Sequence, residues 1–344
     1  MDQFVPLADD AAAPHDADAA ASLDGPRRWR LFARAASLLL LAAVLVPVVV
    51  RMTGWEAGPL VYAVSFLPWV TVACLVPLAL AILARAWRIA AASLVPLALC
   101  VAWMAPLYVV NASSEDAAAA DPALRVATAN LLFGQADPEA VVRMVREGSL
   151  DMLAVEELTP SAVDALREAG IERLLPYSEL RPKRGASGTG LWSRLPFDAV
   201  SAVDFPGMEA VKVTVSVDGE SLTVYAVHPS APGPFDHDAW STEWVALNAL
   251  LAREQGPVVV AGDFNTTRDH RAFRDLEALG FSDAVDQAGA GFLPTFPNGG
   301  FPMPVVAIDH VLTRGSQLTA VAVCTIVIPH TDHRALVVTY VWQD

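Results

Sequence analysis

The chain has 344 residues, of which 54% are hydrophobic and only 18% are charged, and its formal net charge is −15. Soluble proteins are usually about 45–50% apolar and about 25% charged, so this excess of apolar residues indicates that part of the chain lies in a membrane. The acidic charge excludes a protein that holds nucleic acid by a broad basic surface. The three isolated cysteines exclude a disulfide scaffold and a cysteine-based zinc site.

The first third of the chain contains three charge-poor segments, at about residues 35–51, 58–84 and 89–110. A membrane-spanning helix needs about 20 apolar residues, so these segments predict three transmembrane helices. Residues 1–34 are rich in Asp and Ala and lack a basic stretch at their start, which predicts a disordered cytoplasmic tail and not a cleaved signal peptide. Residues 111–121 are polar and are predicted to form a linker.

The distribution of arginines predicts the orientation of these helices. Four arginines precede the first segment, and Arg85 and Arg88 lie between the second and third. No basic residue follows the third segment until Arg125. Because cytoplasmic loops carry the excess of Lys and Arg, we expect a multi-pass protein of a bacterial cell membrane, with its N-terminus in the cytoplasm and everything after Val110 outside.

Residues 122–344 show strand patterns that alternate with helix patterns and then strand patterns alone. Strands are expected at 124–130, 151–155, 190–193, 210–217, 221–227, 257–261, 305–312, 318–328 and 335–342, and helices at 137–147, 159–169 and 236–252. The first of these helices begins with Asp137 as its N-cap and Pro138 at its first position, and Asp218-Gly219 is typical of a hairpin turn. This order predicts a layered α/β domain with mixed sheets.

Polar residues stand where five of the apolar runs end, which is where ligands gather in open α/β sheets. These residues are Asn130, Glu156-Glu157, His228, Asp263-Phe264-Asn265 and Asp309-His310, and a sixth cluster, His330 to Arg334, precedes the last strand. Taken singly, each is most simply a turn residue or a hydrogen-bonded surface or core residue. Together they supply carboxylate and amide oxygens that suit Mg²⁺, Mn²⁺ or Ca²⁺, and imidazoles that can contact phosphate and transfer protons.

The order of these residues resembles the endonuclease/exonuclease/phosphatase superfamily, which includes DNase I-like nucleases, inositol polyphosphate phosphatases and sphingomyelinases. The motifs that carry the resemblance are Gly262-Asp263-Phe264-Asn265, Ile308-Asp309-His310, Asp332-His333 and the stretch from Gly188 to Pro196. The resemblance covers essentially all of residues 122–344. It implies an α/β fold of the DNase I-like type, a four-layer α/β sandwich with two mixed sheets.

The resemblance also implies roles for the polar residues. Glu157, with Asn130 and Asp332, would hold one or two Mg²⁺ or Mn²⁺ ions. Asp263 would orient or deprotonate the attacking water, and Asn265 would hold a non-bridging phosphate oxygen. Family members often carry Gln just before the metal-binding Glu, where this chain has an acid, so the identity of the metal-binding Glu stays open. Its place in the motif favours Glu157.

The imidazoles receive separate roles. The resemblance implies that His333, oriented by Asp309, contacts the phosphate and shares in proton transfer, and that His228 is a candidate general acid for the leaving oxygen. We expect His310 to be structural, because neighbouring side chains on a strand point to opposite faces.

The three-helix anchor with an outer catalytic domain resembles bacterial membrane proteins associated with resistance to teicoplanin-type glycopeptides. The predicted function is therefore a metal-dependent phosphoesterase that acts outside the membrane on a lipid-linked phosphate or pyrophosphate, such as undecaprenyl pyrophosphate, and forms no stable nucleic-acid complex. The apolar, proline-rich stretch 292–304 is expected to rest on the bilayer, line a lipid groove or pack over the sheet edge. The alternatives are an extracellular nuclease and a non-catalytic domain that binds a lipid or glycopeptide.

Overall fold

The computed structural model describes residues 17–110, 120–233, 237–299 and 303–342. The chain divides into two compact units. The first consists of residues up to Leu45 together with Val72–Leu97, and the second consists of Val46–Thr71 together with the chain from Ala98 onward. The expected linker at 111–121 lies almost entirely outside the described residues.

The apolar third of the chain is helical. Its elements are α1 (Ala17–Thr53), α2 (Leu60–Ser65), α3 (Leu67–Ala73), α4 (Leu75–Leu83), α5 (Trp87–Met104) and the short 3₁₀ helix η1 (Ala105–Tyr108). By length and composition, the described residues contain two helical stretches able to cross a membrane, Arg27–Thr53 and Trp87–Tyr108. The expectation of three such helices is therefore wrong. The expectation of a disordered tail is also wrong for residues 17–34, which belong to α1.

The middle apolar segment is broken into short helices because of its prolines. The breaks at Phe66 and Cys74 come just before Pro68 and Pro77, which fall in the first turns of α3 and α4. Proline lacks the amide hydrogen that a helix interior requires, but the first turn leaves that position unpaired in any case. The longest apolar helical stretch in this segment therefore runs only from Leu67 to Leu83.

In the first unit, α1 packs on α4 through small and polar contacts. Ser37 Oγ donates to the carbonyl oxygen of Pro77 at 2.7 Å, and Arg34 Nη2 donates to that of Ala84 at 3.2 Å. Large apolar side chains point outward instead, and Leu39 is 73% exposed and Leu83 65% exposed. Close packing of small residues with apolar side chains on the outside is typical of helices surrounded by lipid.

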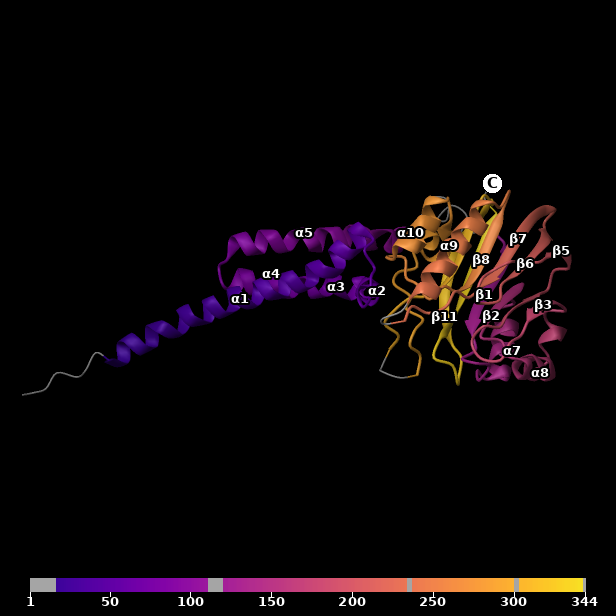
Figure 1. Cartoon of the computed structure of the whole chain (residues 1–344), viewed down its shortest axis with the longest axis horizontal. Helices are drawn as coiled ribbons and strands as arrows, with labels where there is room; N and C mark the ends of the chain where they lie inside the picture. The colour runs from indigo at the N-terminus through magenta and orange to yellow at the C-terminus, as the bar shows by residue number, and fades with distance from the viewer. Residues whose placement is uncertain (1–16, 111–119, 234–236, 300–302, 343–344) are drawn as a thin grey trace, which may run out of the picture. The chain divides into compact units, whose positions relative to one another are not determined.

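The second unit contains two six-stranded sheets (Figure 1). The first has the strand order β11-β12-β1-β2-β4-β3, and the second has the order β5-β6-β7-β8-β10-β9. The strands are β1 (Leu124–Asn130), β2 (Met152–Glu156), β3 (Tyr177–Arg181), β4 (Thr189–Ser193), β5 (Phe197–Ser201), β6 (Val211–Val217), β7 (Glu220–Val227), β8 (Val258–Asp263), β9 (Ser282–Asp283), β10 (Asp309–Arg314), β11 (Leu318–Val327) and β12 (Arg334–Trp342). β1 runs parallel to β2 and β7 parallel to β8, whereas the other pairs are antiparallel, so both sheets are mixed.

Helices cover the outer face of each sheet. The helices of residues 120–342 are α7 (Pro138–Glu147), α8 (Pro160–Ala169), η2 (Ile171–Arg173), α9 (Asp238–Ala252), α10 (Arg271–Ala278) and α11 (Ala284–Ala288). Of these, α11 contributes Ala284 to the core between the sheets. Residues of α7 and α8 share a core with β1, β2 and β4, and residues of α9 and α10 share a core with β7, β8 and β10. In Figure 1, α7 and α8 accordingly lie beside β2, and α9 and α10 beside β8.

A third core fills the space between the sheets, so successive side chains along a strand enter different cores. Val126 and Ala154 of the first sheet and Val259 and Ala261 of the second belong to it, all of them nearly or fully buried. Their chain neighbours point to the helix-covered faces instead, as Val260 does. Helix, sheet, sheet and helix thus form the four-layer sandwich that the sequence predicts.

The strands and helices expected in residues 122–344 are all present, with ends shifted by a few residues. The sequence did not indicate β3, β5, β9, α10 or α11. β3, β5 and β9 lie at sheet edges, where one side lacks a neighbouring strand and the apolar alternation is weak. Arg194 of the Gly188–Pro196 motif pairs with Asp151 at the start of β2, far along the strand from Glu156, which makes that part of the motif structural.

The carboxyl group of Glu277 on α10 predicts a pH-dependent stability. Burial raises the pKa of Glu277 to about 7. The positive charge of Arg268 lowers this pKa, and the negative charge of Asp286 raises it. The folded protein therefore binds this proton more tightly than the unfolded chain does, and its stability falls as the pH rises from the ordinary carboxyl value to about 7. Glu277→Gln should raise the melting temperature at about pH 8 and leave it unchanged at about pH 4.

Thermal unfolding of the full chain in detergent at the two pH values measures this effect. Glu168→Gln, on the exposed face of α8, is the matched control and should shift neither value. An equal shift for Glu277→Gln at both pH values would show that the substitution acts through packing and not through the proton.

Candidate active site

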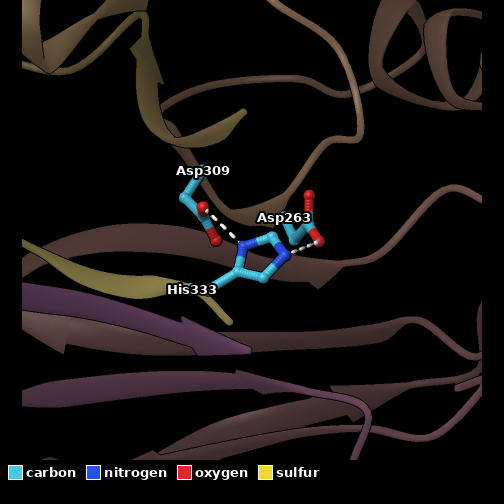
Figure 2. A group of neighbouring side chains, drawn as sticks. All are labelled: Asp263, Asp309 and His333. Carbon is cyan, nitrogen blue, oxygen red and sulfur yellow. Dashed lines mark hydrogen bonds and ion pairs between the residues drawn. The ribbon is translucent and has the colours of Figure 1, made fainter. Parts of the chain in front are cut away.

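The two aspartates that end the apolar runs of the second sheet face each other. Asp263 ends β8 and Asp309 begins β10, and these antiparallel strands place the two residues opposite one another. Gly262 comes just before Asp263 because a Cβ there would overlap the carbonyl oxygen of Val227 on the neighbouring strand. His333 enters from the loop before β12 of the other sheet, so the group straddles the two sheets (Figure 2).

His333 lies between the two aspartates. Its Nδ1 is 2.9 Å from Asp309 Oδ2, and its Nε2 is 3.6 Å from Asp263 Oδ2. The dashed lines in Figure 2 mark these two contacts. Burial lowers the pKa of His333, but the charges of Asp309 and Asp263 outweigh it and raise this pKa to about 10. Burial raises the pKa of Asp263, but His333 and His228 outweigh it and lower this pKa to about 2. At neutral pH the pair is therefore an imidazolium and a carboxylate.

These ionisation states narrow the role of Asp263. A carboxylate with a pKa near 2 accepts a proton poorly at neutral pH, whereas it accepts hydrogen bonds well. Its Oδ1 accepts from the backbone N–H of Asn265 at 2.9 Å, and its Oδ2 accepts from Asn130 Nδ2 at 2.9 Å. Of the two roles implied by the resemblance, we therefore expect Asp263 to orient the attacking water.

Glu157 and Asn130 lie at the adjoining ends of β2 and β1. Asn130 Nδ2 donates to Glu157 Oε1 at 3.2 Å, and the backbone N–H of Phe133 donates to Glu157 Oε2 at 2.7 Å. The side-chain oxygen of Asn130 accepts from the backbone N–H of Leu132 at 2.9 Å. Asn130 thus acts as a donor that joins the carboxylates of Glu157 and Asp263, and its role as a metal ligand stays a prediction.

Asp332 interacts with the neighbouring His333 through its negative charge. It contributes to the raised pKa of His333, and its backbone carbonyl accepts a hydrogen bond from Asn298. The carboxylates of Glu157, Asp263 and Asp332 are hard oxygen donors at one end of the sandwich, and Glu157 keeps lone pairs beyond its two hydrogen bonds. This donor chemistry fits a divalent cation such as Mg²⁺, for which Glu157, Asp332 and Asn130 remain the predicted ligands.

A tighter cluster also has the composition of a metal site. Asp263, Asp309 and His333 offer ligand atoms that all lie within 4.8 Å of one another. His333 Nδ1 is already engaged by Asp309 Oδ2 at 2.9 Å, however, and a metal ion on this ring would have to displace the proton that the raised pKa of His333 favours. These three residues are therefore better described as a hydrogen-bonded triad that presents a positive imidazolium.

His228 and Asn265 stand side by side next to the triad. His228 Nδ1 is 3.2 Å from the carbonyl oxygen of Ala186, and its Nε2 is 3.2 Å from Asn265 Nδ2 and 3.5 Å from Asp263 Oδ2. Burial lowers the pKa of His228, but Asp263 outweighs it and raises this pKa. The second imidazole is thus oriented with Nε2 toward the site, as a general acid would need to be.

Glu156, the neighbour of Glu157, is buried and interacts electrostatically with Asp309, Asp263 and His333. Its side chain is fully buried, and Thr128 Oγ1 donates to Glu156 Oε1 at 2.8 Å. Burial raises the pKa of Glu156 well above its ordinary value, and the charges of Asp309 and Asp263 raise it further. These effects favour the protonated, uncharged form of Glu156, which resembles the amide of the Gln that family members often carry at this place.

Strained backbone accompanies the site. Leu132, Phe133, Glu157 and Asn265 all have positive φ values, between 46° and 54°. Such conformations are uncommon for residues other than glycine and gather at functional sites, where the surrounding structure holds them in place. At Glu157 and Asn265, this conformation turns the chain sharply after β2 and β8, close to the site.

The structure adds supporting residues that no sequence motif indicated. Thr331 Oγ1 donates to the carbonyl oxygen of Asn130 at 2.8 Å and accepts from the backbone N–H of His333 at 3.2 Å. Thr295 Oγ1 accepts from the backbone N–H of Asp309 at 3.4 Å, and the ring of Phe296 lies 4.9 Å from that of His333. These contacts come from loops whose polar residues look ordinary in the sequence.

His310 has the structural role expected of it. Its Nδ1 is 2.6 Å from Asp283 Oδ2, its Nε2 is 3.1 Å from the carbonyl oxygen of Thr266, and its ring packs 4.6 Å from that of Phe273.

His333→Ala should lower kcat/KM by about 10²-fold or more, because it removes the imidazolium from the site. His310→Ala should mainly lower the melting temperature, because it leaves Asp283 buried without its partner.

Steady-state kinetics with a simple phosphodiester, together with thermal unfolding, separates these two effects. Equal losses of kcat/KM for the two variants at equal stability would contradict the assignment of His333.

Comparison with known proteins agrees with this arrangement. The sequence profile of the Endonuclease/Exonuclease/phosphatase family matches residues 127–333. Among solved structures, an AP endonuclease from Archaeoglobus fulgidus is 16% identical, covers 64% of this chain and 100% of its own, and has a TM-score of 0.53. The 3′ phosphatase NExo from Neisseria, bound to a product DNA hairpin, is 18% identical with the same coverages and a TM-score of 0.52.

A family protein from Leptotrichia buccalis C-1013-b is 15% identical, covers 64% of this chain and 100% of its own, and has a TM-score of 0.52. At these identities the likeness concerns the fold alone. No curated protein matches the chain.

Proposed function

The chain belongs to the endonuclease/exonuclease/phosphatase family, whose profile spans more than half of it, and from this premise we propose a membrane-anchored, divalent-metal-dependent phosphoesterase. Members of this family include phosphatases and nucleases and generally depend on a divalent metal. The proposed substrate is a lipid-linked phosphate or pyrophosphate, such as undecaprenyl pyrophosphate, at the outer face of a bacterial membrane. A contribution to glycopeptide resistance belongs to the same proposal.

The packing of the chain after α1 supports a membrane substrate, which family membership alone does not indicate. The segment after the first apolar helix packs into the catalytic domain, within one compact unit. Val61 belongs to the same buried core as Phe264 and Phe273, and its carbonyl oxygen lies 2.9 Å from His270 Nε2. Arg51 Nε donates to Asp269 Oδ1 at 2.7 Å. The site is therefore held close to the C-terminal end of α1, which favours membrane substrates by their high effective concentration.

The chemistry of the site is hydrolysis of a phosphate ester. The bound divalent metal would neutralise charge on the phosphate. Asp263 would hold the attacking water by hydrogen bonding, Asn265 would donate to a non-bridging oxygen, and the His333 imidazolium would contact the phosphate. Asp263 raises the pKa of His228, which favours the protonated imidazole that would be needed to donate to the leaving oxygen.

The alternative function is an extracellular endonuclease. Its support is the likeness of fold to a 3′ phosphatase that was solved with a DNA hairpin. Against it stands the charge, because the acids and arginines before Val110 cancel and the catalytic part of the chain carries the whole net −15. Such a field repels a polyanion, whereas a single phosphate needs only local donors and a metal. A non-catalytic lipid- or glycopeptide-binding domain is disfavoured because every expected site position is occupied by a suitable residue.

A competition assay in proteoliposomes tests the substrate. The full-length protein is reconstituted with undecaprenyl pyrophosphate in the bilayer and plasmid DNA in the same Mg²⁺-containing buffer. We expect release of inorganic phosphate from the lipid with little cleavage of the plasmid. Cleaved plasmid without released phosphate would establish the nuclease, and neither product would favour the non-catalytic domain.

Fusion proteins test the proposed location. Alkaline phosphatase joined after Asp121 should be active, and green fluorescent protein of the cytoplasmic type joined there should be dark. The reverse pattern would place the catalytic domain in the cytoplasm and would remove the outer-face substrates.

A further inference from the structure

A groove of about 410 Å³ lies beside the candidate active site, within the second unit. We define it as the α2 groove, because one wall is formed by Tyr62 and Ser65 of α2 and by Phe66. The opposite wall includes Pro232, Phe296 and Val305. We propose that this groove binds the apolar chain next to the phosphate of the substrate, an inference that rests on the proposed function and assigns the chain-binding part of its site.

The groove and the catalytic residues share a border. Asn265, the expected donor to a phosphate oxygen, also lines the groove. Phe296 lines it as well and packs on the ring of His333, with centroids 4.9 Å apart. Ile308, the residue before Asp309, completes this border. A chain bonded to a phosphate at Asn265 and His333 therefore meets the groove within its first few carbon atoms.

Hydrogen bonds occupy polar groups of both walls, and one of them joins the two walls directly. Tyr62 Oη donates to the carbonyl oxygen of Pro232, and Trp69 Nε1 donates to that of Val305 at 2.7 Å. Ser65 Oγ lies 3.5 Å from His270 Nε2. What remains toward the groove is largely hydrocarbon, which suits an alkyl or isoprenoid chain and offers few donors to the edges of a nucleic-acid base.

The position of the α2 wall indicates where such a chain comes from. α2 follows α1, one of the two helices long and apolar enough to cross a membrane, and Phe66 is still 43% exposed. Ligand pockets are usually about 300–1,000 Å³, so this groove holds only the part of a long chain nearest the phosphate. The rest of the chain would remain in the lipid.

Chain-length dependence of the kinetics tests the groove. The full-length protein in detergent is given a fifteen-carbon isoprenoid pyrophosphate or its five-carbon counterpart, and kcat/KM is measured for each. We expect the wild type to prefer the longer chain. Val305→Asp and Phe66→Asp, which place a charge in the groove, should reduce that preference at least about tenfold. Val200→Asp on the edge strand β5, 48% exposed in the native protein, is the control and should keep the preference.

A labelling experiment separates the groove from catalysis. A photoreactive isoprenoid phosphate is cross-linked to the full-length protein in excess chelator, and the labelled peptides are identified by mass spectrometry. Labelling at α2 and near Val305 without any later hydrolysis would support the groove while refuting the proposed enzyme. Hydrolysis with an unchanged chain-length preference in both charged variants, and labelling elsewhere, would refute the groove while leaving the enzyme. Melting temperatures show that the variants are folded.

Discussion

Asp263→Asn is expected to reduce kcat at least about 10³-fold while the protein remains folded. The carboxylate is the centre of the site: it accepts hydrogen bonds from Asn130 and from the backbone of Asn265, and it faces the Nε2 atoms of both His228 and His333. An amide keeps the shape but removes the charge that raises the pKa of both imidazoles. Turnover of a phosphodiester with saturating Mg²⁺ measures the loss.

A matched control exists on β9, the strand next to β10. Asp283 is also buried and also paired with a histidine, His310, at 2.6 Å. Asp283→Asn should therefore lower the melting temperature and leave kcat within a few-fold of the wild type. A loss of kcat as large as that of Asp263→Asn would mean that burial of a carboxylate, and not its place in the site, determines the effect.

Glu157→Gln is expected to abolish metal-dependent activity and to weaken metal binding by at least about tenfold. Glu157 is the carboxylate whose remaining lone pairs suit a hard cation, whereas the adjacent Glu156 is fully buried and hydrogen-bonded to Thr128. Glu156→Gln is therefore the matched control, since it keeps the shape of a buried side chain that makes no contact with Glu157 in the hydrogen bonds above, and it should retain activity.

Calorimetric titration with Mn²⁺ measures metal binding apart from turnover. Excess chelator should silence the wild type, and added Mg²⁺ or Mn²⁺ should restore it. If Glu156→Gln lost metal binding and Glu157→Gln retained it, the two acids would have to exchange roles. Full activity of the wild type in chelator would refute a metal enzyme altogether.

The sequence by itself determined the layered α/β fold and the candidate site residues. Both depend on local patterns. Apolar alternation decides which residues form strands, and a polar residue that ends such a run must lie at the sheet edge. Asn130, Glu157, Asp263 and Asp309 were found in this way. The structure brings them together because the parallel strands β1 and β2 end side by side, and antiparallel β8 ends where β10 begins.

Other features were decided only by the tertiary structure, because they depend on contacts between residues distant in the chain. The ionisation of His333 follows from its position between Asp309 and Asp263, and the raised pKa of Glu156 follows from its burial, which its polarity does not suggest. The middle apolar segment, residues 58–84, has the composition of a membrane helix. In the structure this segment breaks near its prolines, and Val61 in its first part packs into the core of the catalytic domain. The groove between α2 and the catalytic domain arises from this packing, so neither the apolar segment nor the catalytic domain encodes it alone.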